Sequence, residues 1–240
     1  MAPRNVARRN RLAGKTPRKS VAAVGEGTRL SDLAYTLILE LLFERRLPAG
    51  SFVSQSRLVE LTGVPVAPLR DALRVLEAEG ILTIHPRTGI QFVKPGMELT
   101  RSTYQFRGII ESAAVAIFAE TAAAAEVDAI DVRHRSAVAT VERDGVNSVL
   151  LDELEELENL LHGSIVASLN NPLIENNYRR IRNYLRLIRL DRRLTAPLVL
   201  RSLKEHLAIL DACRRRNAAD AVTALQAHFS AALQRGLGLY

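Results

Sequence analysis

The sequence lacks the residues that cross-link or anchor many proteins. Its 240 residues include one cysteine, Cys213, and no tryptophan. A single cysteine excludes an internal disulfide framework and a zinc site built from cysteines. No run approaches the roughly 18 uncharged apolar residues that a membrane-spanning helix needs. We therefore expect neither a disulfide-rich secreted domain nor a membrane protein.

The net charge of +7 is concentrated at the N-terminus. Residues 1–28 carry seven basic side chains and one acidic side chain, Glu26, whereas residues 97–240 carry equal numbers of both signs. Residues 1–28 show no apolar periodicity, so we expect a disordered basic arm. Two interpretations stay open: a leader that keeps the protein soluble, or an arm that contacts phosphate groups.

Residues 29–94 show three helical patterns followed by a hairpin pattern. The predicted elements are a helix from 30 that stops at 47–50, a helix over 55–61, a helix that follows a turn at 63–64 and runs to 79, and strands at 81–84 and 90–93. This is the layout of a winged helix-turn-helix, in which the third helix reads DNA and the hairpin forms the wing. The alternative is a small α+β domain that has no role on DNA.

After a linker at residues 95–98, residues 99–240 show only helical patterns. The expected helices cover about 99–121, 126–143, 148–169, 172–190, 197–215 and 218–235. Most of these segments are amphipathic, which predicts an antiparallel helical bundle. The expected fold class is therefore mainly α, with an N-terminal winged helix-turn-helix and a C-terminal all-helical bundle.

Several short motifs resemble the GntR family of bacterial transcription factors. They are Leu47-Pro48-Ala49-Gly50, Gly63-Val64, Pro68-Leu69-Arg70-Asp71-Ala72-Leu73, Leu76-Glu77-Ala78-Glu79-Gly80 and Arg87-Thr88-Gly89. The all-helical half is similar to the FCD ligand domain of that family, and its six helices are closer to the VanR branch than to the FadR branch. The resemblance covers residues 30–235 and implies a regulator that binds DNA.

The resemblance also implies which residues contact DNA. They are Ser56, Val66, Ala67, Arg70, Arg87, Thr88 and Gly89. The reading helix departs from the usual Ser-Arg-Thr of the family, which is Pro65-Val66-Ala67 here. Loss of that arginine removes a contact worth about 1–3 kcal/mol, although valine and alanine can still touch thymine methyl groups. Arg70 is retained, and we expect it to reach a base edge or a phosphate.

Three histidines lie on apolar faces of the C-terminal helices: His162, His206 and His228. Glu158 precedes His162 by four residues, so both side chains project from one side of one helix. A carboxylate within an apolar stripe is costly unless it is paired or binds a metal. One carboxylate and three imidazoles suit Zn, Ni, Mn or Fe with open positions. Taken singly, each histidine is more often a core or interface residue than a ligand.

The resemblance to the FCD domain favours the metal interpretation. Many FCD domains hold a divalent metal with an Asp-x3-His helix and two later histidines. Glu158, His162, His206 and His228 match these positions, with glutamate in place of aspartate. The implied cofactor is a divalent metal, with zinc expected first.

The resemblance further implies that Arg107 and Asn171 bind an effector. Arg107 begins an Arg-x-x-x-Glu motif that ends at Glu111. Beside a metal, a buried guanidinium is a suitable clamp for a carboxylate. The alternative for Arg107 is a structural salt bridge to Glu111. We expect two further side chains to lie at the surface: Glu205, as the neighbour of His206, and His134, which stands between arginines. The alternative for Glu205 is that it orients a metal-binding histidine.

Together these observations predict a cytoplasmic, sequence-specific transcription regulator that associates with the nucleoid when it binds DNA. A homodimer would bind an inverted repeat, because two-fold proteins read two-fold sites. A small carboxylate metabolite beside the metal would control DNA affinity, and the protein would act mainly as a repressor. Two alternatives stay open: a helical metalloenzyme with an open site of three histidines and one glutamate, and a DNA-architectural protein with a structural metal.

Overall fold

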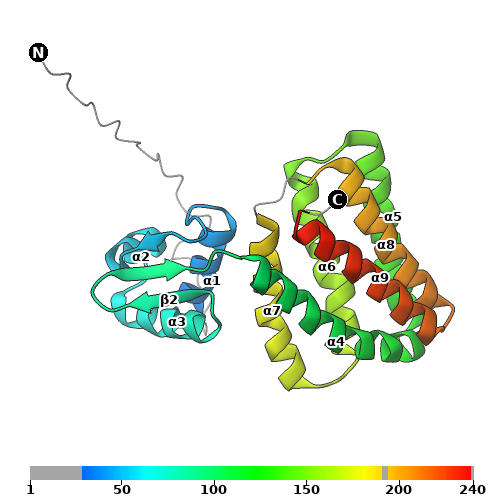
Figure 1. The fold of residues 1–240 in the computed structure, drawn as a ribbon, viewed down its shortest axis with the longest axis horizontal. Helices are drawn as coiled ribbons and strands as arrows, with labels where there is room; N and C mark the ends of the chain where they lie inside the picture. Colours follow the sequence, from blue (N-terminus) through cyan, green and yellow to red (C-terminus); the bar gives the residue numbers. More distant parts are fainter. Residues whose placement is uncertain (1–28, 191–193, 239–240) are drawn as a thin grey trace, which may run out of the picture. The chain divides into compact units, whose positions relative to one another are not determined.

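The computed structural model describes residues 29–190 and 194–238, which form two compact units (Figure 1). One unit ends at Val93 and the other begins at Lys94. The expected basic arm, residues 1–28, lies outside the described residues. The two units are described separately below.

The N-terminal unit combines three helices with a small antiparallel sheet. Its elements are α1 (Leu30–Phe43), β1 (Phe52–Val53), α2 (Gln55–Thr62), α3 (Val66–Ala78), β2 (Leu82–His85) and β3 (Gly89–Phe92). The sheet has the order β1-β3-β2, with Phe52 opposite Gln91 and Ile84 opposite Ile90. Apolar side chains from all three helices and from β3 fill the core, so the three helices and the hairpin pack as one unit. The expected helices and hairpin are all present.

The turn between α2 and α3 sets the reading helix in place. The Ser54 side chain accepts a hydrogen bond from the backbone N–H of Arg57 and so caps α2. Gly63 ends α2 with a φ of 70°, a left-handed conformation that favours glycine. Pro65 stands at the N-cap of α3 and gives it no side-chain cap. The fixed φ of proline suits the start of a helix, so α3 begins without that bond.

The short strand β1 was not predicted, because two residues give no alternating pattern. It pairs with β3 beside Gly89, which has a φ of 127°. A Cβ atom at position 89 would lie 3.0 Å from the backbone oxygen of Val53. Gly89 is therefore required both by its backbone conformation and by this close approach.

Replacing Gly89 with alanine is expected to destabilise the N-terminal unit by roughly 1–3 kcal/mol, because alanine disfavours this φ and its methyl group meets β1. Differential scanning calorimetry of the full chain should show the transition of this unit at a lower temperature, since about 1 kcal/mol shifts a domain of this size by roughly 4–8 °C. Gly108→Ala is the control, because a Cβ there meets nothing within 4 Å. An unchanged transition in Gly89→Ala would contradict the prediction.

The described part of the C-terminal unit consists of six helices. They are α4 (Met97–Thr121), α5 (Ala124–Asp144), α6 (Ser148–Ala167), α7 (Pro172–Leu190), α8 (Ala196–Arg214) and α9 (Ala218–Gly236). Helix α4 packs along α9, and α8 packs against both α5 and α9 (Figure 1). Because α4 also contacts α6 and α7, its buried face lies at the centre of the bundle.

Over the described residues, no single helix is long and apolar enough to cross a membrane. The bent pair α4 and α5, with an angle of 116° between them, meets the length and composition criteria only when the two helices are taken together.

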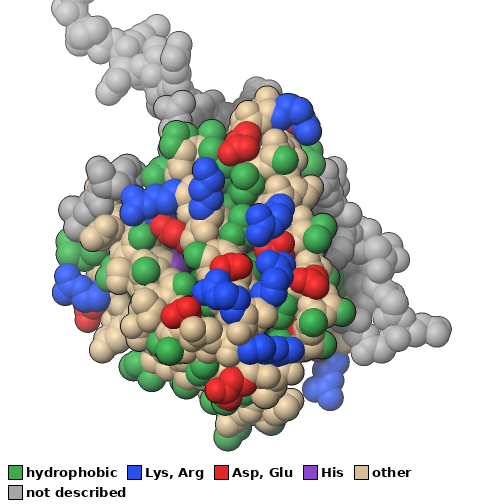
Figure 2. All heavy atoms as spheres, turned by 90° about the vertical axis from the view of Figure 1, so that its right-hand side faces the viewer, with side chains coloured by type: hydrophobic (Ala, Val, Ile, Leu, Met, Phe, Trp, Pro, Cys, Tyr) green, Lys and Arg blue, Asp and Glu red, His purple; other side chains and the backbone are tan. Residues whose placement is uncertain are grey.

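Figure 2 shows basic and acidic side chains mixed over one face of the C-terminal unit, with very little histidine visible. Four of the five histidines of the chain lie buried inside this unit.

Candidate metal centre

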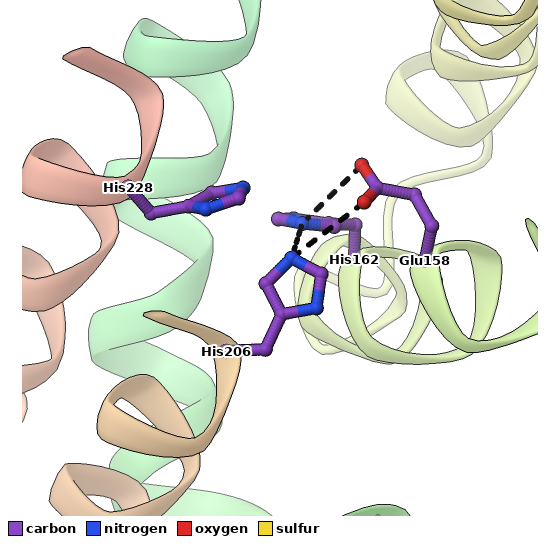
Figure 3. Close-up of side chains that lie close together, drawn as sticks. All are labelled: Glu158, His162, His206 and His228. Carbon is purple, nitrogen blue, oxygen red and sulfur yellow. Dashed lines mark hydrogen bonds and ion pairs between the residues drawn. The ribbon is translucent and has the colours of Figure 1, made fainter. Parts of the chain in front are cut away.

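The four expected ligands meet inside the helical bundle (Figure 3). Glu158 and His162 come from α6, His206 comes from α8, and His228 comes from α9. Each offers one ligand atom, and these atoms all lie within 4.8 Å of one another. All four residues are buried. The four residues that the resemblance implied as ligands therefore lie together in the fold.

Two of the imidazoles hydrogen-bond through Nδ1 to carboxylates, of which Glu111 is buried and Glu205 is half-buried. His162 Nδ1 donates to Glu111 Oε2 over 2.5 Å, and His228 Nδ1 donates to Glu205 Oε2 over 2.9 Å. Burial alone would raise the pKa of Glu111, but the charge of Arg107 and the bond from His162 outweigh it and lower that pKa to about 2. Glu111 is therefore ionised at neutral pH and accepts the proton-bearing edge of His162.

Glu205 was expected to face solvent, and that prediction is wrong. Its side chain is only 18% exposed. Besides accepting from His228, Glu205 Oε2 accepts a hydrogen bond from Arg235 Nη2 over 2.7 Å. Burial raises the pKa of Glu205, but these two hydrogen bonds lower it overall to about 2. The adjacent residues Glu205 and His206 of α8 thus have different contacts. His206 lies in the cluster, and Glu205 hydrogen-bonds to His228 and Arg235 of α9.

The third imidazole hydrogen-bonds to another histidine. His206 Nδ1 lies 3.2 Å from His134 Nε2, and His134 Nδ1 lies 2.8 Å from the backbone oxygen of Ile130. Burial lowers the pKa of both imidazoles, so both are neutral at neutral pH. His134 was expected at the surface, and that prediction is wrong, because its side chain is fully buried. The apolar neighbours Ile130 and Ala137, on the same face of α5, could have revealed this.

The Nε2 atoms of the three clustered histidines point toward one another (Figure 3). His162 Nε2 lies 3.4 Å from His206 Nε2, and the Glu158 carboxylate lies 3.5 Å from the first and 3.6 Å from the second. His228 Nε2 is buried and has no hydrogen-bond partner among the described residues. Burial also lowers the pKa of His228 to about 4, which keeps this imidazole neutral. Imidazole nitrogens that face a carboxylate are a donor set that divalent metals bind, so the residues fit a metal.

Arg107 lies fully buried between two carboxylates. Its Nε donates to Glu111 Oε1 over 2.5 Å, and its Nη1 donates to Glu158 Oε1 over 3.1 Å. Arg189 Nη2 lies 2.7 Å from the same Glu158 oxygen. The salt bridge to Glu111 that was open as an alternative is therefore present. Two guanidinium groups balance two carboxylates in this part of the bundle.

Asn171 has a structural role at the start of α7. Its Oδ1 accepts hydrogen bonds from the backbone N–H groups of Leu173 and Ile174. This is the geometry of a helix N-cap. Effector binding by Asn171 and by Arg107 stays a prediction.

The expected DNA-contact residues lie on the N-terminal unit and are mostly exposed. The exposed ones are Ser56 on α2, Val66, Ala67 and Arg70 on α3, and Arg87 and Thr88 in the wing turn. Gly89 is half-buried against β1. Arg70 Nε donates to Gln55 Oε1 over 3.4 Å, a long bond that joins α3 to α2. Contact of these side chains with DNA stays a prediction.

Comparison with known proteins assigns both units. The family model described as "FCD domain" matches residues 102–231, and the one described as "Bacterial regulatory proteins, gntR family" matches residues 30–92. A Bacillus subtilis protein, described as an uncharacterized HTH-type transcriptional regulator, YdhC, is 21% identical over 196 residues. That match covers 82% of this chain and 86% of the relative.

Two solved structures share the fold at low sequence identity. Escherichia coli McbR/YncC has a TM-score of 0.72 and 15% identity, and the match covers 89% of this chain and 99% of that one. A putative transcriptional regulator GntR from Rhodococcus sp. RHA1 has a TM-score of 0.71 and 18% identity, and the match covers 89% and 100% of the two chains. These similarities confirm the expected fold class.

Proposed function

Because the chain belongs to the GntR family of bacterial transcription regulators and carries an FCD domain, we propose that a small carboxylate, bound beside a divalent metal, controls its hold on operator DNA. In this proposal the chain acts as a repressor in the cytoplasm. The family assignment makes it a transcription regulator and not an enzyme, so the metalloenzyme alternative is not supported. The observation that carries the proposal is the set of imidazole Nε2 atoms that face Glu158 in a chain with a winged helix-turn-helix.

The donor set favours zinc among the divalent metals. Three imidazoles and one carboxylate, from Glu158, His162, His206 and His228, suit zinc, with nickel, manganese and iron as the alternatives. When bound, the metal would supply a Lewis-acidic position for a carboxylate oxygen. Meanwhile Arg107 and Arg189 hold Glu158 Oε1, so the other oxygen of this carboxylate faces His206.

The charges around the site support an anionic effector. Without a metal, Arg107 and Arg189 balance Glu111 and Glu158. A divalent ion adds two positive charges to a buried region, and such a region is stabilised by an anion. Three of the five N–H groups of Arg107 hydrogen-bond to Glu111 and Glu158 in the described structure, which leaves donors for a carboxylate.

A homodimer would place two winged units on an inverted repeat. Helix α4 offers a surface for a second copy, since its exposed positions from 109 to 117 are Ile109, Ala113 and Ile117, none of which is charged. Ile109 is 67% exposed and Ile117 is 39% exposed. Exposed apolar side chains at this spacing are typical of helices that pack against a partner.

The proposal is tested by capture of genomic DNA fragments on the purified full chain at about 150 mM salt, where non-specific phosphate contacts weaken. Retained fragments that share a short inverted repeat are the expected result. Retention of all fragments, lost as salt is added, would contradict sequence-specific recognition. Adding candidate carboxylates with zinc and measuring release of the captured fragment then tests effector control.

Arg70→Ala is expected to weaken binding to a selected fragment by roughly 5–150-fold, which corresponds to a contact of about 1–3 kcal/mol. Affinity is measured by fluorescence anisotropy of labelled DNA, because the chain has no tryptophan. Arg143→Ala is the matched control, since it removes an exposed arginine from the C-terminal unit. Equal losses in the two variants would mean that only total charge matters.

A further inference from the structure

We infer that His134 is a positioning residue for the metal site: it accepts the Nδ1 hydrogen of His206 and so directs the Nε2 lone pair of His206 into the ligand cluster. The inference rests on the proposed metal site and adds a residue outside the four ligands. His134 comes from α5, which supplies none of those ligands.

The direction of the hydrogen bond follows from the partner behind His134. Its Nδ1 lies 2.8 Å from the backbone oxygen of Ile130, and a carbonyl oxygen can only accept. His134 therefore carries its hydrogen on Nδ1, and its Nε2 presents a lone pair. That lone pair lies 3.2 Å from His206 Nδ1, so His206 is the donor.

This bond fixes which nitrogen of His206 can bind a metal. A neutral imidazole has one N–H group, so the hydrogen on Nδ1 leaves Nε2 unprotonated. His206 Nε2 then faces His162 Nε2 at 3.4 Å and Glu158 Oε2 at 3.6 Å. An unprotonated Nε2 of His206 at these distances can share a cation with the neighbouring imidazole and carboxylate. The fixed hydrogen thus prepares a position that a cation stabilises.

His134 completes a pattern shared by all three ligand histidines. His162 and His228 donate their Nδ1 hydrogens to the ionised carboxylates of Glu111 and Glu205. His206 donates to a neutral imidazole instead. His134 thus orients the third ligand without adding a third negative charge to those of Glu111 and Glu205. It does not act as a fourth histidine ligand, since its Nε2 faces Nδ1 of His206 and not the cluster.

Zinc competition against a chromophoric chelator, with the full chain, tests the inference. His134→Leu removes the acceptor and is expected to weaken zinc binding by about 10–100-fold, the usual cost of losing a partner that orients a metal ligand. His134→Gln keeps an acceptor oxygen and is expected to bind zinc more tightly than His134→Leu. If His134→Leu binds as tightly as the wild type, or if glutamine restores nothing, the inference is overturned.

His206→Leu separates the inference from the proposed metal site. A wild type that binds zinc no better than His206→Leu would mean that the proposed site itself fails. A wild type that binds tightly while His134→Leu matches it would mean that only the role of His134 fails.

A second measurement does not depend on the folding of a variant or on metal. Two-bond ¹⁵N–¹H correlation spectra of the metal-free wild type report which imidazole nitrogen carries hydrogen. The expected result is His206 protonated at Nδ1 and bare at Nε2. A hydrogen on Nε2 of His206 would overturn the inference directly.

Discussion

Replacing Arg107 with leucine is expected to lower the free energy of unfolding of the C-terminal unit by about 3–5 kcal/mol, because it leaves two buried carboxylates without their shared partner. The guanidinium is fully buried and bonds to both Glu111 and Glu158. It also lies 4.6 Å from the centre of the Phe229 ring, so the substitution removes a cation–π contact as well. Urea unfolding followed by circular dichroism measures the loss.

The control for this prediction is an ion pair at the surface. Arg143 bonds to Asp144, and the two side chains are 68% and 45% exposed. Since solvent screens such pairs, Arg143→Leu is expected to leave the free energy of unfolding nearly unchanged. A comparably small cost for Arg107→Leu would show that solvent or rearrangement compensates the two carboxylates, contrary to the buried geometry.

Replacing His228 with leucine removes a proposed ligand and is expected to weaken zinc binding. The loss should exceed the roughly 10–100-fold cost of removing a partner that only orients a ligand. His228 Nε2 is a buried atom that lacks a hydrogen-bond partner among the described residues. Isothermal titration calorimetry with zinc measures the change. Zinc should also raise the melting temperature of the wild type, since a ligand at 100 times its Kd adds about 2.7 kcal/mol of stability.

His85→Leu is the matched control for the ligand substitution. His85 lies on β2 in the N-terminal unit and hydrogen-bonds to Gln91. Its removal is expected to leave zinc affinity and the zinc-induced rise in melting temperature unchanged. If His228→Leu binds zinc like the His85→Leu control, His228 is not a ligand.

The helices could be predicted from local periodicity, and the inward-facing positions of the cluster residues could be predicted in the same way. The six expected C-terminal segments agree with α4 to α9 to within two residues at each end. Glu158 and His162 share a helix face by their spacing alone. His206 and His228 lie on apolar faces that had to point inward. To infer that these four residues, from three helices, form one site, the family resemblance was needed in addition.

The contacts behind the ligands could not be predicted in the same way. Glu111 comes from α4, His134 from α5 and Glu205 from α8, and only the packing of these helices brings them to the imidazoles. His134 stands between two arginines in sequence, which indicated a surface position. Because successive helical residues point about 100° apart, charged neighbours say little about where a side chain faces.

Five helices contribute either a ligand or the hydrogen-bond acceptor behind it, from Glu111 on α4 to His228 on α9. A single bound ion would therefore join distant parts of the chain as a set of covalent bridges would, and would stabilise the folded state by its binding free energy, because the ligands meet only there. The sequence has only one cysteine and cannot form such bridges itself. Unlike a disulfide, this cross-link persists under reducing conditions, and a chelator removes it without breaking a covalent bond. If the site binds metal as proposed, metal supply would set the rigidity of the helical domain.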